Sequence, residues 1–589
     1  MDRQRPLIAA VAGVAAIALI AACSSSKNNN PPSTGGGTGG GGSSASSSGG
    51  GGGPSATANI VNPGFTQKGG IVSILSDANY EHLDPCNNYV TNSGEFGRLI
   101  YRALTFIKDT PGEKPSIQPD LAEDTGTPSD GGKVWTFKIR KGLKFEDGTP
   151  ITAKDIKYGI ERTFDPSLCV DGATYMADTL INSNNYQGPY KDPNKDLTSV
   201  QTPDEYTMVF HFQGPQPDAA WMMSLFYTVP VPKAKDTKQN YDFHPVASGP
   251  YKISKYVPDK SISLVRNPNW SAASDPNRPA LPDGFNETFG IDLPTISQRL
   301  IADQGPDQNA VTLENSGALQ NGDLPKIRQA SVKARFVNGP GPCIDYEWMN
   351  ETKITDPDVR KAIAMAINRQ AIQTIYGGDL FGSVYDSVIP PGIEGVNVAG
   401  LGLKADGDPA GAKALLAGKT VPTLHYGVSS TSVKQKTVAT QIQNDLKQAG
   451  INVVIDQIPG DSYYKTIRSD KAPDFGRAGW CFDWPTSASI VPPILGPDAA
   501  GKTWSSNNFS KYFDPSVSKQ IKALASSTQS PTEIGKQLND ITNQVLTSNW
   551  PLLPTIASLD PQMVGSNVQN AGASPIFSEI DLNTIGVKQ

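Results

Sequence analysis

The densest group of chemically capable side chains lies near Arg477, where the chain reads Arg-Ala-Gly-Trp-Cys-Phe-Asp up to Asp483. A carboxylate such as Asp483 in a cleft with little water can hold an ammonium group, and such a charge-assisted hydrogen bond contributes about 1.5–3 kcal/mol. Arg477 is placed to meet a carboxylate, Gly479 permits close backbone approach, and Trp480 can form the wall of a pocket. The alternative interpretation is that Trp480 belongs to a core and Asp483 to a surface turn before Pro485.

Other signals of catalysis or cofactor binding fail a structural requirement. Residues 496–503 match the phosphate-loop formula, but a true loop follows a buried strand and opens a helix. Here Pro492-Pro493 precedes the motif and a polar run after Trp504 follows it. We find neither a serine nucleophile elbow nor a paired-carboxylate motif. We therefore predict no enzyme, no cofactor and no metal site, since metal-ligand spacing is also lacking among the widely separated histidines, which are His82, His211, His244 and His425.

The beginning of the chain has the features of an export signal. After a basic start, residues 7–20 form an apolar run too short to cross a bilayer comfortably, and Ala21-Ala22-Cys23 follows. This stretch also resembles the lipobox of bacterial lipoproteins, in which the cysteine sulfur receives a diacylglyceryl group and becomes the first residue after cleavage. The resemblance implies a signal peptide over 1–22 and an extracytoplasmic protein anchored to the cell membrane through Cys23, with acyl chains such as palmitate. An uncleaved signal anchor is the alternative.

A Gly/Ser-rich tether is expected over residues 23–66. It contains almost nothing that could build a core, so we predict that it stays disordered. A flexible coil of this length has an end-to-end distance of roughly 35–40 Å. A folded body on such a tether could move over a membrane protein without leaving it.

The remaining residues are too many for one simple core, so two or more domains are expected. The net charge of −6 is mild and no basic stripe is present, which argues against nucleic acid as a partner. An even number of further cysteines in an exported chain indicates two disulfides, for which three pairings are open. These cysteines are Cys86, Cys169, Cys343 and Cys481. We see no internal repeat and no later membrane span.

The sequence after the tether predicts an α/β fold. Thr152 and Asp155 read as an N-terminal cap of a helix that runs to about Arg162. Residues 358–372 have helical spacing of apolar side chains. Residues 433–449 form a second clear helix that ends at a glycine, and the β-branched run 451–455 predicts the strand of an αβ unit.

Residues 136–155, from Thr136-Phe137-Lys138 to Ala153-Lys154-Asp155, resemble the signature block of the family 5 extracellular solute-binding proteins of ABC importers. This is the oligopeptide, dipeptide and nickel group. Further pieces of the family pattern occur in the expected order along the chain, and the resemblance covers roughly residues 68–589. These pieces are Leu83-Asp84-Pro85, 99–104, Ser248-Gly249-Pro250-Tyr251, 266–270, 358–369, Ile389-Pro390-Pro391 and 410–416.

The resemblance implies an α/β, two-lobed clamp of the type II periplasmic-binding-protein kind with an extra inserted domain. Lobe one would combine 67–110, 200–342 and 551–589, the inserted domain would span 111–199, and lobe two 343–550. A ligand that contacts both lobes would stabilise the closed form, which would dock as a monomer on a permease. ATPase subunits of the importer would hydrolyse ATP.

Within the family, the segment that ends at Asp483 is similar to the oligopeptide-binding branch. There the aspartate holds the α-ammonium group of the peptide, and the strand before it pairs with the peptide main chain. The branch also has a disulfide at the corresponding cysteines, which implies the pairing Cys343–Cys481 here and leaves Cys86–Cys169. The implied ligand-binding residues are Arg477, Gly479, Trp480, Cys481, Phe482 and Asp483. The flank Trp484-Pro485-Thr486 departs from the branch, so other cargoes (a metal chelate, a sugar or a glycan) and a non-transport lipoprotein scaffold stay open.

Overall fold

The computed structural model describes residues 58–313, 319–498, 500–559 and 561–589. The predicted signal peptide, the lipidation site Cys23 and most of the predicted tether lie outside the described residues. The tether prediction was wrong for its last residues, because the amide of Val61 donates to the carbonyl oxygen of Ala571 over 2.7 Å and the Val61 side chain is buried. The apolar pair Ile60-Val61 gives this stretch a surface to bury.

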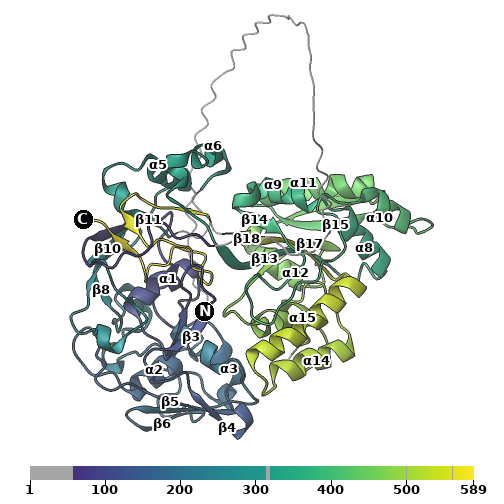
Figure 1. Cartoon of the computed structure of the whole chain (residues 1–589). Helices are drawn as coiled ribbons and strands as arrows, with labels where there is room; N and C mark the ends of the chain where they lie inside the picture. Colours follow the sequence, from purple (N-terminus) through teal and green to yellow (C-terminus); the bar gives the residue numbers. More distant parts are fainter. Residues whose placement is uncertain (1–57, 314–318, 499, 560) are drawn as a thin grey trace, which may run out of the picture. The chain divides into compact units, whose positions relative to one another are not determined.

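A five-stranded sheet forms the first core (Figure 1). β1 runs parallel to both of its neighbours, whereas the remaining pairs are antiparallel. In order across the sheet, the strands are β11 (Ala310–Thr312), β1 (Ile71–Leu75), β10 (Gly284–Thr288), β9 (Ser261–Arg266) and β8 (Tyr251–Val257). Residues from near the C-terminus, such as Val568 and Val587, pack into the same core as Val72, so the two ends of the described chain meet here.

A four-stranded antiparallel sheet is formed by residues that lie between β1 and β8 in the sequence. Its order is β4 (Thr127–Ser129), β5 (Val134–Lys138), β7 (Thr207–His211) and β6 (Val200–Asp204). Beside it, α2 (Ala153–Arg162) begins with the predicted capping box, in which the Asp155 carboxylate accepts from the Thr152 amide over 2.8 Å. Strand pairing assigns 200–211 to this sheet, because β7 pairs with β5 and β6 pairs with β7. The sequence-based division ended the inserted domain at 199.

A six-stranded sheet forms the other large core. Its order is β14 (Gly382–Val384), β18 (Leu552–Leu559), β13 (Pro340–Met349), β17 (Phe475–Cys481), β15 (Leu424–Ser429) and β16 (Val453–Ile458). Figure 1 shows α9 (Arg369–Tyr376) and α11 (Val433–Gln448) on one side of the sheet, and α14 (Pro515–Ala525) and α15 (Pro531–Ser548) on the other. β18 pairs with β13, so strand pairing carries this core past the predicted boundary at 550.

The predicted helix over 358–372 is two helices. α8 (Pro357–Ala366) ends before Asn368, whose side chain accepts from the amide of Ala371 over 2.7 Å and so begins α9. An asparagine whose side chain accepts from an amide three residues later favours the start of a new helix over the continuation of the preceding one. The helix expected over 433–449 is confirmed as α11, and β16 begins and ends slightly later than the predicted strand.

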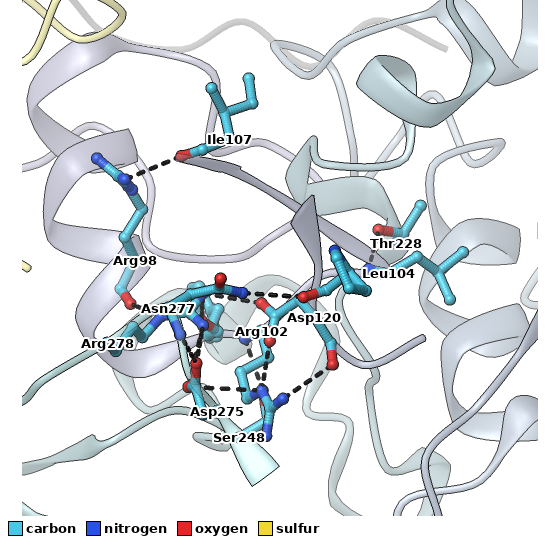
Figure 2. A network of polar contacts seen from close by, with 12 residues as sticks. Arg98, Arg102, Leu104, Ile107, Asp120, Thr228, Ser248, Asp275, Asn277 and Arg278 are labelled. Atoms are coloured by element: carbon cyan, nitrogen blue, oxygen red, sulfur yellow. Dashed lines mark hydrogen bonds and ion pairs between the residues drawn. The ribbon is translucent and has the colours of Figure 1, made fainter. Parts of the chain in front are cut away.

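Buried ion pairs join segments of the chain that follow α1 (Thr91–Ile100). Figure 2 shows guanidinium groups of Arg102 and Arg278 that share the carboxylate of Asp120, and Arg278 also contacts Asp275. In the described part of the chain, no helix is both long and apolar enough to span a membrane.

Candidate ligand-binding site

The segment that the sequence singles out is carried by β17 and the turn after it. β17 pairs antiparallel with β13, and the register places Cys343 opposite Cys481. These cysteines form a disulfide, and Cys86 and Cys169 form a second one, which are the two pairs that the family resemblance implied. The bridge at the end of β17 fixes the strand against its neighbour, two residues before Asp483.

The carboxylate of Asp483 is held by two phenols. Tyr89, which precedes α1, donates to Oδ1 over 2.5 Å, and Tyr175, the first residue of α3 (Tyr175–Thr179), donates to Oδ2. Helix α1 packs into the core of the five-stranded sheet. The carboxylate therefore lies at a contact between the part of the chain that carries this sheet and the part that carries the six-stranded sheet.

Within the described residues, the side-chain hydrogen bonds to the Asp483 carboxylate come from phenol groups alone. Burial raises the pKa of this carboxyl group, and the two phenol hydrogen bonds lower it in part. Burial and the neighbouring carboxylate raise the pKa values of Tyr89 and Tyr175, so both hydroxyls stay protonated donors at neutral pH. Among the residues that the structure describes, no cationic side chain pairs with Asp483. An ammonium group from outside the chain would supply the missing positive charge.

Comparison with known proteins identifies the family. The model of the bacterial extracellular solute-binding proteins, family 5 Middle, matches residues 116–502. The chain belongs to this family.

Individual relatives agree with this assignment. The probable ABC transporter periplasmic-binding protein SapA of Escherichia coli is 23% identical over 563 residues, which cover 88% of this chain and 89% of SapA. The periplasmic oligopeptide-binding protein OppA of Salmonella typhimurium is 26% identical over 409 residues, 66% of this chain and 70% of OppA. The solved structure of clavulanic acid biosynthesis oligopeptide binding protein 2 has a TM-score of 0.82 and 28% identity, and the match covers 91% of this chain and 99% of that one. The fold is thus the two-lobed α/β fold of periplasmic solute-binding proteins.

Arg477 lies on β17 with its charge already compensated. Its guanidinium forms an ion pair with Asp345 on β13 and lies 5.3 Å from the ring centre of Tyr376. Burial alone would lower the pKa of Arg477, but the carboxylate of Asp345 raises it, so the guanidinium stays charged. A ligand carboxylate would have to compete with Asp345 for this group.

The other predicted residues differ in what they contact. Gly479 lies opposite Asp345, and a Cβ at this position would come within 3.0 Å of the Asp345 carboxylate, so glycine leaves room for the ion pair. The indole of Trp480 donates to the carbonyl oxygen of Ser489 over 3.0 Å and packs against the apolar core. Cys481 is committed to its disulfide.

Two cavities adjoin the turn, and the buried ring of Phe482 borders both. The first, of about 110 Å³, reaches Asp483 and Tyr89. The second, of about 290 Å³, lies beside Pro485 and is bordered by residues 112–115 and by β14. Each cavity is lined by segments from both lobes, so a ligand held at Asp483 has space on either side of Phe482.

Sequence reasoning missed a second inter-lobe contact beside this site. The carboxylate Oδ2 of Asp218 accepts from the indole of Trp484 over 2.7 Å and from the hydroxyl of Thr486 over 2.6 Å. The rings of Trp484 and Tyr175 lie 4.8 Å apart, which links this contact to Asp483. The sequence marks Trp484-Pro485-Thr486 only as a departure from the family pattern, because the partner of a long-range contact leaves no local signal.

Proposed function

We propose that this protein captures oligopeptides between its lobes and delivers them to the permease of an ABC importer, whose ATPase subunits hydrolyse ATP. The observation that carries the proposal is the carboxylate of Asp483, which lies at the inter-lobe contact with phenols as its only side-chain partners among the described residues. Each oxygen of a carboxylate offers about two acceptor sites. Both oxygens therefore keep capacity for the α-ammonium group of a peptide.

The edge of β17 supports recognition of a peptide main chain. β15 pairs with β17 only at Phe475 and Gly476, whereas β13 pairs along the whole strand. Within the described residues, the half of β17 from Arg477 to Cys481 therefore has a strand partner on one side only. An extended peptide can add to such an edge through main-chain hydrogen bonds that do not depend on its side chains.

Binding would act on the permease through lobe closure. A ligand shifts a conformational equilibrium only if it binds one state better than the other. A peptide whose ammonium group joins Asp483 on one lobe and Tyr89 and Tyr175 on the other would favour the closed state. The closed form would be the state that docks on the permease and delivers the peptide.

Free peptides are expected to stabilise the protein, and N-acetylated peptides are not. We expect tri- to pentapeptides at about 100 times their dissociation constant to add about 2.7 kcal/mol to the free energy of unfolding, seen as a rise in melting temperature. Acetylation removes the ammonium group that Asp483 would hold. Equal rises in melting temperature with both peptide forms would reject the amine anchor. A rise with a sugar or a metal chelate, but not with peptides, would point to another cargo. Native mass spectrometry of the purified protein would identify retained cargo independently.

We further infer that diacylglyceryl modification of Cys23 anchors the protein to the outer side of the cell membrane. The lipobox-like sequence before Cys23 and the Gly/Ser tract after it support this inference. In a bacterial host that processes lipoproteins, the wild type should partition almost entirely with detergent in phase separation, because two acyl chains anchor stably. The Cys23→Ser variant should move to the aqueous phase, whereas the control Ser24→Ala should not. Detergent-phase partition of Cys23→Ser would contradict the inference.

A further inference from the structure

We propose that the cavity beside Asp483 makes the protein selective for peptides whose first side chain is aliphatic and of medium size. This inference rests on the proposed function, because it assumes that Asp483 holds the peptide ammonium group. The cavity reaches Asp483 itself, so a side chain attached next to that ammonium group would enter it. Its walls are mainly apolar or aromatic and come from both lobes; among them are Leu225, Phe226, Tyr227, Phe482, Ile576 and Phe577.

The size of the cavity favours side chains such as those of valine, leucine and isoleucine. Its volume is about 110 Å³. An apolar protein cavity of about 150 Å³ holds benzene, so this one accepts a branched aliphatic group but is too small for an indole. Leucine carries three more carbon atoms than alanine, and removing their apolar surface from water is favourable. Leucine at the first position should therefore bind at least tenfold more tightly than alanine.

The charges around the cavity oppose an ionised first side chain. Arg98 and Arg278 border the cavity, and both guanidinium groups lie over the ring of Phe106, at 4.7 and 4.5 Å from its centre. Arg98 already donates to Glu95 and Asp109, and Arg278 to two other aspartates. A lysine or arginine side chain would meet these cations, and an acidic one would lose its water without gaining a free donor.

A peptide series on the wild-type full chain tests the selectivity without any substitution. Calorimetric titration would compare Leu-Ala-Ala with Ala-Ala-Ala, Lys-Ala-Ala, Asp-Ala-Ala and Trp-Ala-Ala. We expect the leucine peptide to bind at least tenfold more tightly than each of the others. Equal affinity for the leucine and alanine peptides, or tighter binding of a charged one, would overturn the inference. Binding of none of the peptides would instead count against the proposed function.

A cavity-filling variant locates the selectivity. Ala173 lines the cavity in the loop before α3 and is half-buried. We expect Ala173→Leu to weaken binding of Leu-Ala-Ala about tenfold and to change binding of Ala-Ala-Ala little. The matched control is Ala177→Leu, at an exposed position of α3 outside the cavity lining, which should change neither. Leu225→Ala, which enlarges the cavity, should shift the preference toward Trp-Ala-Ala. If Ala173→Leu weakened both peptides equally, the cavity would not be the seat of the first side chain.

Discussion

Replacing Asp483 by asparagine should weaken the binding of a free tripeptide by about 10- to 150-fold. This range is the affinity equivalent of the 1.5–3 kcal/mol that a charge-assisted hydrogen bond contributes. Asparagine keeps the size of the side chain, and a phenol hydroxyl can both donate and accept. The contacts of Tyr89 and Tyr175 can therefore persist, so the loss should report the charge and not a collapsed turn. Calorimetric titration of wild type and Asp483→Asn at neutral pH measures it.

A double comparison separates the amine contact from other effects. If Asp483 holds the ammonium group, N-acetylation of the peptide should weaken binding to the wild type strongly and to Asp483→Asn little, because both changes remove the same interaction. Asp204→Asn is the matched control, since the Asp204 carboxylate also accepts two hydrogen bonds, from Thr207 and from the amide of Tyr206, but lies on β6 in the four-stranded sheet. Full additivity of the two losses would refute the amine contact.

The same contact predicts a direction of pH dependence. Binding needs an ionised Asp483 and a protonated peptide amine. Burial raises the pKa of Asp483 above the ordinary value of about 3.9. The affinity of the wild type should therefore begin to fall at a higher pH than an exposed carboxylate would allow, and Asp483→Asn should lack this fall.

Local sequence signals predicted several elements of the fold well. The capping box at Thr152 and the helix-glycine-strand order around Gly450 depend on neighbouring residues, and both are present. The family pattern also implied which cysteines pair, and therefore which two strands lie side by side before the turn that carries Asp483. These features follow from short-range chemistry or from a resemblance that spans most of the chain.

The partners of the site residues could not be predicted, because they come from distant segments. Tyr89 and Tyr175 are separated from Asp483 by most of the chain, and no spacing rule links a phenol to such an acceptor. Arg477 was expected to meet a ligand carboxylate, and the sequence did not reveal that its guanidinium forms an ion pair with Asp345 on the neighbouring strand. Register across a sheet decided that contact, and register depends on the folded structure.

The stability of the first lobe should depend strongly on a buried ion network, which was also not predicted from the sequence. Arg278 is buried, and its guanidinium donates to Asp275 over 3.0 Å and to Asp120 over 2.9 Å (Figure 2). Arg102 contacts the same Asp120 over 2.6 Å. Removing one partner of a buried pair leaves an uncompensated charge away from water, which typically costs about 3–5 kcal/mol. Arg278→Met should therefore lower the free energy of unfolding by about that amount, as measured by urea denaturation.

The control is an arginine of the same type in an exposed pair. Arg328 lies 3.6 Å from Asp379, and both side chains are mostly exposed. Exposed pairs contribute about 0–1 kcal/mol, so Arg328→Met should unfold at nearly the wild-type urea concentration. Similar losses in the two variants would show that the buried network does not hold the lobe together.

The pH dependence of the difference between wild type and Arg278→Met tests the cause of the loss. Burial raises the pKa of Asp275, but the charges of Arg278 and Arg102 lower it more, so the net pKa is below its ordinary value of about 3.9. A depressed carboxyl pKa stabilises the fold above the ordinary value, and that contribution is lost as the pH falls through the folded-state value. The difference between the two proteins should thus stay constant at neutral pH and narrow only in acid. A difference that persisted unchanged after protonation of the carboxyl groups would mean that Arg278 acts through packing on Phe106 and not through its charge.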